Sequence, residues 1–496
     1  MDRNEFVDGS PMLLTSTENA GNLPAVLREM REHLKGVPAN DPLMALSAVR
    51  EALDAIVLAK DMALQTQARA VAELDEAAQA PLRGVFKGFL QAVALRSPRG
   101  DVLRTAATGH FSEISSACQL VLDRGRYAMK SQPETLAEIA ARLVRAETNR
   151  LKWQHMVYGP FDEGLWLRTG RVFLESVEEA RYQVPVTLRF GRETATSVVK
   201  EMTRAVALQC AGLNQLPPDL IDVTDRLIHY ILPVLHLSSS LVEGARYYWE
   251  PSLGKLPRRI VRAEPIPGAW YFSAQNADGA LSELEAMLHK GVVPGVLDVG
   301  PGSRDRLFAS IRHLRRCWCD APVKRRYRRH VMAGPVKGVR GFLGLQRALR
   351  GVGETIEEWE LHDASVGGMA VMAPVDGGAM PRIGDLMAVR SEDASEWRLG
   401  MVRRLSRGDG SSAFVGLETF ATAPKSVRAD DGRSPVEILL CDPMRRGAIL
   451  RVVAPLNALR PGVPLFVADA GAIQKLKPLG SNWRGSEFEV RTYLVL

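Results

Sequence analysis

Cysteine is scarce in this chain, and its scarcity argues against a disulfide framework. Five cysteines, an odd number, are spread over 496 residues, whereas disulfide-stapled domains are small and carry dense, even sets of cysteines. Cys317 and Cys319 flank Trp318, but no further Cys or His pair lies at matching spacing, and a structural zinc ion requires four ligands. The sequence therefore predicts buried, reduced thiols and no metal site.

The motifs of several common enzyme classes are also missing. The chain contains no G-x-x-x-x-G-K-[ST] phosphate loop, no H-E-x-x-H zinc motif, no G-x-S-x-G nucleophile motif and no EF-hand spacing. Its nine histidines are scattered singly. We expect neither catalytic residues nor a cofactor, and we predict that the protein is not an enzyme.

Long uninterrupted hydrophobic runs are absent. The most apolar stretch, 227–242, is interrupted by His229, Pro233, His236 and three serines, whereas a membrane-spanning helix needs about 20 consecutive, mostly apolar residues. The first residues lack the basic start and apolar core of a signal peptide. We therefore expect a soluble, cytoplasmic protein without a membrane span.

Acidic residues are missing from one strongly basic segment. Residues 321–350 hold nine Lys or Arg and no Asp or Glu, and the whole chain has a net charge of +7, so the remaining residues sum to −2. A basic site on a nearly neutral chain favours a compact anionic ligand, because a nucleic-acid track needs basic residues spread over a face. We therefore do not expect nucleic acid as the partner.

Two arginines in this segment, Arg325 and Arg329, form an R-x-x-x-R motif. A guanidinium group is planar and permanently charged, so it can bind phosphate or the O6/N7 edge of guanine and can also stack on a base. Arg326 and Arg328 are candidates for supporting contacts. The motif alone is weak evidence, because residues 312–316 match it as well.

A second motif, D-x-S-x-x-G, begins after a gap of 33 residues and comprises Asp363, Ser365 and Gly368. Its surroundings predict a strand, a tight turn and a second strand. Two residues that are two positions apart share one face of a strand, so both side chains can present oxygen atoms to the N1–H and N2–H groups of guanine. Gly367 and Gly368 let the backbone approach a ligand closely or adopt positive φ. The alternative is an ordinary turn in which Asp363 and Ser365 bond their own backbone.

With both motifs in order, residues 325–420 resemble a PilZ domain, the bacterial receptor module for cyclic di-GMP. The strand pattern that follows the motifs, at 383–389, 397–405 and 414–420, also fits that family. The stretch between the motifs is longer than the family's, and residues 351–355 are expected to mark an enlarged loop or the end of a short helix.

The resemblance implies a fold, a ligand and roles for the motif residues. It implies an antiparallel six-stranded β-barrel that binds cyclic di-GMP. Arg325 and Arg329 would contact guanine and phosphate, Asp363 and Ser365 would contact guanine, and Gly368 would shape the turn. No GGDEF-like or EAL-like stretch is present, so we expect the chain to read the messenger without making or degrading it.

The fold class expected for the chain is an all-α N-terminal region, then the PilZ-like barrel, then a small C-terminal β module. Apolar residues recur at three and four positions before residue 250, which is typical of helices. The expected domains are an α-helical region at 1–250, an α/β connecting segment at 251–322, the barrel at 323–425 and a β domain at 430–496. Residues 421–435, rich in Ala, Pro, Asp and Gly, are expected to form a linker.

Two helices of the N-terminal region have clear start signals. Asp41 is expected to cap a helix that has Pro42 at its first position, and Pro133 opens another. In the second helix the residues expected to face inward are Leu136, Ile139, Leu143 and Val144, and those expected to face outward are Arg142, Arg145 and Glu147.

The favoured function is a cytoplasmic cyclic di-GMP receptor. Its arginine loop would order over the ligand and reposition the helical region, which would present or hide a surface for a protein partner. Two alternatives stay open. One is a nucleic-acid-binding or other polyanion-binding protein that uses the basic segment 324–350, and the other is a scaffold in which a PilZ fold binds no nucleotide.

Overall fold

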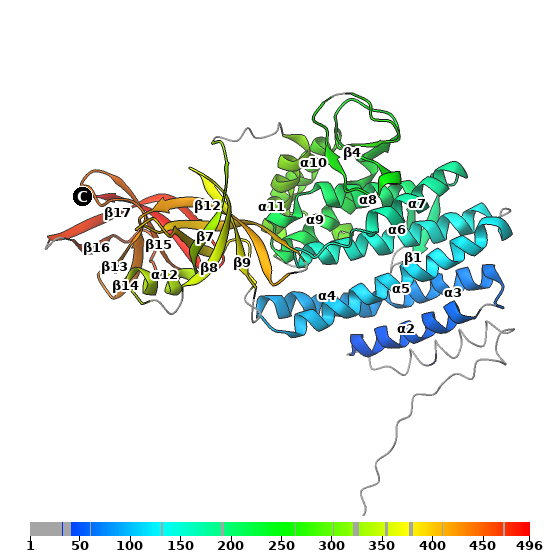
Figure 1. Cartoon of the computed structure of the whole chain (residues 1–496), viewed down its shortest axis with the longest axis horizontal. Coiled ribbons are helices and arrows are strands. Elements are labelled where there is room, and N and C mark those ends of the chain that lie inside the picture. Colours follow the sequence, from blue (N-terminus) through cyan, green and yellow to red (C-terminus); the bar gives the residue numbers. More distant parts are fainter. Residues whose placement is uncertain are drawn as a thin grey trace, which may run out of the picture.

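The computed structural model describes the chain in two parts, a helical region followed by two β-barrels along the long axis of the molecule (Figure 1). No helix of the described part is long and apolar enough to cross a membrane. The described residues are 32, 41–59, 61–129, 132–189, 193–262, 264–300, 302–320, 327–352, 356–375, 380–408, 410–469 and 472–496.

Ten α-helices of the described residues precede the barrels. The Asp41 carboxylate accepts a hydrogen bond of 3.0 Å from the Met44 amide, and Pro42 is the first helical residue, so the predicted cap of α2 is confirmed. A π-helical turn at Arg315–Cys319 continues the last helix. The ten helices are α2 (Pro42–Leu58), α3 (Leu64–Ala77), α4 (Gln79–Ala94), α5 (Arg99–Ala128), α6 (Pro133–Met156), α7 (Leu165–Glu178), α8 (Val198–Cys210), α9 (Pro218–Ile231), α10 (Ala277–His289) and α11 (Arg304–Leu314).

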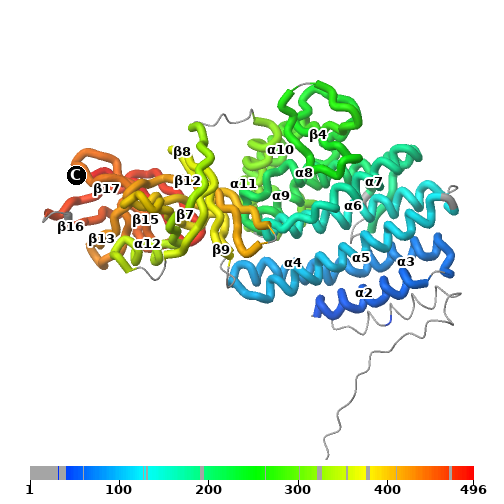
Figure 2. Tube along the Cα trace, viewed as in Figure 1, coloured from blue at the N-terminus to red at the C-terminus, as the bar shows by residue number. Residues whose placement is uncertain are grey.

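Helix α6 is buried on nearly all sides, which corrects one prediction. It lies between α5 on one side and α8 and α9 on the other (Figure 2). Arg142, Arg145 and Glu147, expected to face solvent, are only 1%, 8% and 0% exposed. Buried charges require partners, and here Arg142 pairs with Asp75 while Arg145 forms two hydrogen bonds to Glu201.

Short strands accompany these helices. One hairpin and one four-stranded sheet with the order β3-β6-β4-β5 lie in this region. Strand β6, helix α10 and helix α11 with its π-helical turn lie in the segment 251–322, which was expected to contain both helix and strand. The strands are β1 (Val186–Arg189), β2 (Glu193–Thr196), β3 (His236–Ser238), β4 (Ala245–Trp249), β5 (Arg258–Arg259) and β6 (Trp270–Ser273). Runs of two to five residues are too short for a pattern with a period of two to be recognised.

The first barrel is closed, six-stranded and antiparallel, as the sequence predicts. Its strand order is β10-β11-β12-β9-β8-β7. Helix α12 (Gly341–Leu349) lies between the first two strands in sequence and accounts for the long stretch between the motifs. The strands are β7 (His330–Arg340), β8 (Glu357–Ser365), β9 (Gly368–Pro374), β10 (Leu386–Ser391), β11 (Arg398–Arg407) and β12 (Ser412–Thr422).

The C-terminal β module is a second closed six-stranded barrel, with the order β13-β14-β15-β18-β17-β16. Its first strand lies inside the segment 421–435, so the prediction of a linker there is wrong. Only Ala423 and Pro424 separate the two barrels, because pairing with β14 and β16 makes the polar segment a strand. The strands are β13 (Lys425–Asp430), β14 (Pro435–Leu440), β15 (Ile449–Pro455), β16 (Leu465–Asp469), β17 (Ala472–Arg484) and β18 (Phe488–Val495).

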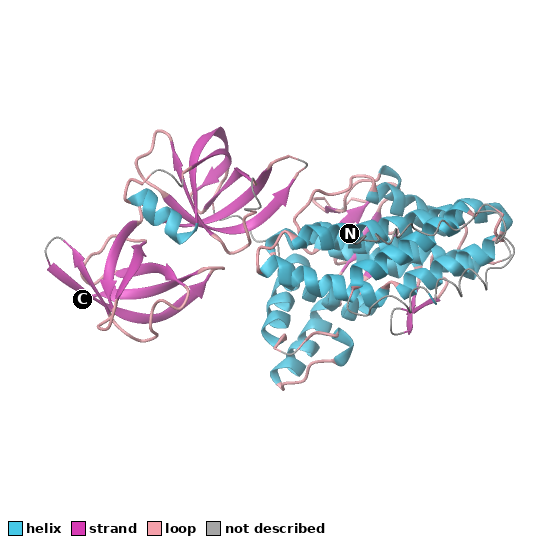
Figure 3. Ribbon diagram, turned by 90° about the horizontal axis from the view of Figure 1, so that it is seen from below, coloured by secondary structure: helices cyan, strands magenta, loops and turns pink. Residues whose placement is uncertain are grey.

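The two barrels lie side by side and share an apolar interface (Figure 3). Residues 386–389 of β10 and 399–402 of β11 are buried on both faces: one face lines the barrel interior and the other packs against the second barrel. This explains their nearly continuous hydrophobic runs. Members of the interface include Val339, Phe342, Leu345, Leu386, Leu399 and Met401 on the first barrel and Leu439, Val453, Phe488 and Val490 on the second.

The helical region contacts the first barrel through the loop 157–164. The Arg407 amide at the end of β11 donates a hydrogen bond of 2.7 Å to the Tyr158 carbonyl. A Cβ on Gly159, which has φ of 110°, would lie 2.3 Å from the Arg407 carbonyl oxygen. Since only glycine permits this approach, the loop and the end of β11 fit closely together.

Two buried histidines make the stability of the helical region depend on pH. Burial lowers the pKa of both His110 and His155 from 6.5 to about 4. Below pH 6.5 the unfolded chain therefore binds more protons at these two histidines than the folded chain does. The free energy of unfolding is highest above pH 6.5 and decreases as the pH falls toward 4. Each histidine should contribute roughly 3 kcal/mol to the lost stability.

We expect urea unfolding at pH 7 and pH 5 to show about 2 kcal/mol of this loss for each histidine, and the loss should be smaller in His110→Leu. Neither ring nitrogen of His110 has a hydrogen-bond partner in the described part of the chain, so leucine removes no bond of the folded state. The exposed His236 supplies the control, because His236→Leu should leave the pH dependence unchanged. An equal pH dependence in wild type and His110→Leu would contradict the prediction.

Candidate ligand site on the first barrel

The second motif forms the turn between β8 and β9. Ser365 is the last residue of β8 and is paired in register with Gly368, the first residue of β9. The Ser365 hydroxyl donates a hydrogen bond of 3.1 Å to the Gly368 carbonyl, and the Thr419 amide of β12 donates one of 3.2 Å to the Gly367 carbonyl. The predicted strand, tight turn and strand are therefore present, and the turn is bonded to a third strand.

Gly368 is explained by close packing of strands. A Cβ at this position would lie 2.4 Å from the carbonyl oxygen of Leu417 in β12, which is backbone and cannot move aside. A Cβ on Gly367 would lie 3.2 Å from the Tyr327 ring. The barrel's own backbone therefore requires Gly368, whereas the sequence argument allowed a ligand or a positive φ as the reason.

A β-bulge sets the direction of the Asp363 side chain. Leu361 pairs with Val371 in the barrel core, but Asp363 pairs with Ala370, so one extra residue is inserted in β8. Because a bulge shifts the alternation of side chains, Asp363 lies on the outer face. The motif therefore presents its carboxylate to solvent, beside the preceding His362, whose Nδ1 lies 3.9 Å from Asp363 Oδ2.

The structure brings one residue of each motif together. Arg329 Nη1 donates hydrogen bonds of 2.9 and 3.0 Å to the two carboxylate oxygens of Asp363. Both side chains remain partly accessible, at 31% and 16% of their surface. Arg328 is exposed beside them, whereas Arg325 and Arg326 lie outside the described residues.

Exposed apolar residues follow both members of this ion pair in the sequence. Val331 of β7 is the cross-strand neighbour of Asp363 and is 85% exposed. Met332 and Val366 are 51% and 76% exposed. Directly opposed residues of antiparallel strands project to the same face, so Val331 lies beside the carboxylate. A guanidinium, a carboxylate and apolar surface in one place suit a ligand with phosphate, hydrogen-bonding edges and flat faces.

The chain leading into the arginine motif is anchored to the helical region. Arg246 of β4 donates hydrogen bonds to the carbonyls of Cys319, at 2.6 Å, and of Asp320. The Tyr247 hydroxyl donates one of 3.1 Å to the Cys317 carbonyl. The motif segment thus connects an anchored point on the helical region with the rim of the first barrel.

The cavity beside the barrels is less suited to bind an anion. This cavity of about 430 Å³ lies where α4 and the two barrels meet, but its cations have carboxylate partners: Arg96 pairs with Glu487, and Arg340 pairs with Glu357. Within the described ranges no group of His, Cys, Asp and Glu could hold a metal ion, and the five cysteines are free thiols.

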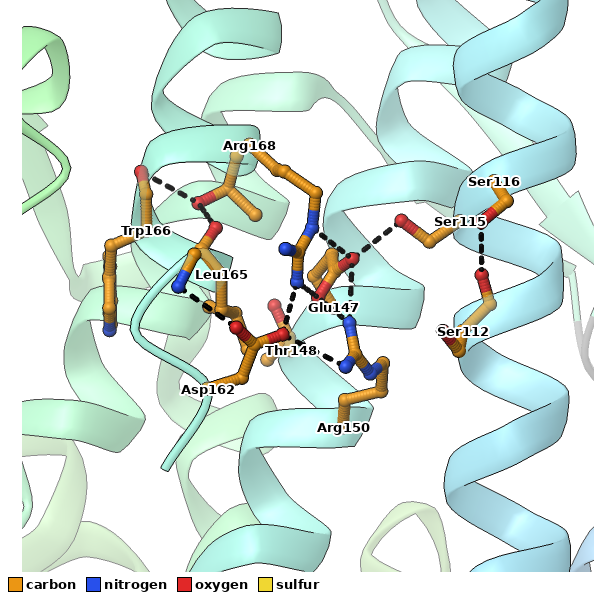
Figure 4. A network of polar contacts seen from close by, with 12 residues as sticks. Ser112, Ser115, Ser116, Glu147, Thr148, Arg150, Asp162, Leu165, Trp166 and Arg168 are labelled. Atoms are coloured by element: carbon orange, nitrogen blue, oxygen red, sulfur yellow. Dashed lines mark hydrogen bonds and ion pairs between the residues drawn. The ribbon is translucent and has the colours of Figure 1, made fainter. Parts of the chain in front are cut away.

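A second polar centre, which the sequence argument missed, surrounds Glu147 in the helical region (Figure 4). The fully buried Glu147 accepts hydrogen bonds from Ser115 at 2.6 Å, from Arg150 at 2.8 and 3.1 Å and from Arg168 at 3.1 and 3.3 Å. Both arginines also bond Asp162. This network orders the loop 157–164 that contacts the first barrel.

The electrostatics of this centre indicate a structural role. Burial alone would raise the pKa of Asp162, but the hydrogen bond and charge of Arg168 outweigh burial and hold that pKa below its usual value. The Asp162 carboxylate is therefore ionised and held by two arginines, so it is not poised to transfer a proton. The sequence carried no signal for this centre, because its members are up to 53 positions apart (Ser115 to Arg168).

The comparisons with known proteins bear on the helical region. The comparison with curated proteins found no match, and neither did the comparison with solved structures. The scan of family models found a match that covers helices α2 to α9. Residues 28–241 match the family described as "Cyclic-di-GMP receptor FimW, N-terminal domain".

Proposed function

We propose that this protein is a cytoplasmic receptor for cyclic di-GMP whose first barrel is a PilZ domain. The observation that carries the proposal is the Arg329–Asp363 ion pair beside the Ser365 turn on the outer face of a six-stranded barrel. The match of residues 28–241 to a cyclic-di-GMP receptor family supports it independently, because that match lies outside the barrel.

In this proposal Asp363 has two tasks. In the free protein it holds Arg329, using one terminal nitrogen of the guanidinium, so the other donors of Arg329 stay available for phosphate or guanine. With ligand bound, Asp363 and Ser365 would accept the N–H groups of guanine. Arg325 would add a second guanidinium, with Arg326, Arg328 and Gly367 in supporting roles.

We infer that ligand binding changes how the helical region sits on the barrel. The motif segment begins at residues that Arg246 holds and ends at Arg329 on the barrel rim. If this segment orders over the ligand, the distance between its two ends is fixed, which biases one placement of the helical region. A surface of the helical region would then be presented to, or hidden from, a protein partner.

The structure does not favour the polyanion alternative. Three arginines of the basic segment 324–350 contact carboxylates: Arg329 contacts Asp363, Arg340 contacts Glu357 and Arg350 contacts Glu437. These pairs neutralise part of the charge that a nucleic-acid track would need. The described residues of the segment therefore leave a local site and no continuous basic face.

Calorimetric titration of the full chain with cyclic di-GMP at physiological salt tests the proposal. We expect a dissociation constant on the order of 1 μM or lower for wild type and no measurable binding by Asp363→Ala. Asp442→Ala is the matched control, because Asp442 pairs with Arg451 on the second barrel in the same way. A folded wild-type protein that releases no heat would favour the scaffold, and equal binding by Asp363→Ala would favour the polyanion alternative.

A further inference from the structure

The hairpin of β4 and β5, residues 245–262, combines exposed apolar side chains with unneutralised positive charge. The chain around β4 projects from the helical region on the side away from α2 and α3 (Figures 1 and 2). Leu253, Leu256 and Val261 are 51%, 48% and 93% exposed. Residues 251–262 carry four cations and no acid, and all four are exposed: Lys255, Arg258, Arg259 and Arg262.

The backbone of the hairpin is held in one shape. Tyr247 and Tyr248 pair in register with Arg259 and Arg258, and the Ile260 amide donates a hydrogen bond of 2.9 Å to the Arg246 carbonyl. At the turn, a Cβ on Gly254 would lie 2.8 Å from the Leu167 Cβ. The exposed apolar residues are therefore not the tips of a loosely attached loop.

Protection of a sheet edge explains only part of this composition. Strand β5 is an edge strand, and charged residues on edge strands prevent unwanted pairing. That argument covers Arg258 and Arg259. It does not explain why Leu256 and Val261, on either side of the two arginines, are exposed, nor why the described residues offer no carboxylate within ion-pair distance of the four cations.

We propose that this hairpin binds the surface of an anionic lipid membrane. The four cations would face the head groups, while Leu256 and Val261 would enter the interface, where Tyr248 of β4 would also be favoured. A lipid surface accepts apolar tips separated by cations, whereas a protein partner requires a complementary patch of about 800 Å². A nucleic acid would use the cations but leave the apolar tips in water. A lipid surface is therefore the occupant that uses both features.

Co-sedimentation of the full chain with vesicles tests the proposal. We expect binding to be at least about tenfold tighter with 30% phosphatidylglycerol in phosphatidylcholine than with phosphatidylcholine alone. The double variant Arg258→Glu/Arg259→Glu should lose at least about tenfold in affinity. Its control is Arg445→Glu/Arg446→Glu, which makes the same charge change at two exposed arginines of the second barrel and should bind as wild type does.

The apolar part is tested separately by Val261→Asp. We expect a loss of at least about fivefold, because an apolar group that enters the interface is replaced by a charge. Ile473→Asp, at a 76% exposed position of β17, should have no effect. Circular dichroism verifies that each variant is folded.

Three results would overturn the proposal. Equal losses in both double variants would indicate general attraction by net charge. Vesicle binding that does not depend on the hairpin would place the contact elsewhere. Loss of binding in Arg258→Glu/Arg259→Glu but not in Val261→Asp would mean that no apolar side chain enters the interface and that the attraction is electrostatic alone. None of these results depends on whether the protein binds cyclic di-GMP.

Discussion

Replacing Arg329 by alanine is expected to weaken cyclic di-GMP binding by a factor of tens or more. Each charge-assisted hydrogen bond contributes about 1.5 to 3 kcal/mol, so one lost phosphate contact already costs more than tenfold. The Asp363 carboxylate would also lose the partner that bonds both of its oxygens, and its charge would then oppose the phosphates. Arg329→Lys should recover only part of the affinity, since an ammonium group lacks the planar fork.

A double-mutant cycle distinguishes the two tasks that we assign to Asp363. If Asp363 acts mainly by holding Arg329, then Asp363→Asn and Arg329→Ala should be strongly non-additive in calorimetry, because either change removes the same contact. If each residue contacts the ligand independently, the two losses should add. Arg451→Ala, which breaks a comparable pair on the second barrel, should bind normally. Unchanged affinity in Arg329→Ala would contradict the proposed site.

The second large effect concerns the helical region. Glu147→Ala should lower the free energy of unfolding by about 3 to 5 kcal/mol, because removing one partner of a buried ion pair leaves uncompensated charge. Two guanidinium groups would lose this carboxylate, and Ser115 would lose its acceptor. The measurement is urea unfolding followed by the helical signal in circular dichroism.

Glu418→Ala provides the comparison for Glu147→Ala. Glu418 pairs with Arg403, and both side chains are more than half exposed, so its removal should cost less than about 1 kcal/mol. Glu147→Gln should be intermediate, since it keeps an acceptor oxygen but not the charge. A loss below about 1 kcal/mol for Glu147→Ala would show that the network does not stabilise the helical region.

The sequence predicted those features that depend on neighbouring residues. The cap of α2 by Asp41 and the turn that carries Asp363 and Ser365 are local, and each has a local signature. The six-stranded first barrel was expected from a family resemblance that rests on motif order and strand spacing. The placement of Arg325 stays a prediction, because it lies outside the described residues.

The features that the sequence could not predict depend on distant partners. The apolar pattern of α6 identifies one inward face. Arg142 and Arg145 can nevertheless be buried because they pair with Asp75 and Glu201, and these partners lie 67 and 56 positions away in the sequence. The polar composition of β13 likewise favoured a linker, but this segment is a strand because it pairs with β14 and β16. Both errors have the same cause. Polar residues were expected to be exposed to solvent, whereas their burial or strand pairing depends on partners elsewhere in the chain.

The apolar interface between the two barrels has a mechanical consequence. Residues 386–389 of β10 and 399–402 of β11 are buried on both faces, and a closely packed apolar interface does not deform gradually. The barrels should therefore turn together as one rigid body, which meets the helical region at Tyr158–Arg407 and at Arg96–Glu487. A small rotation about these contacts produces a displacement that grows with distance, so the far end of the second barrel would travel furthest.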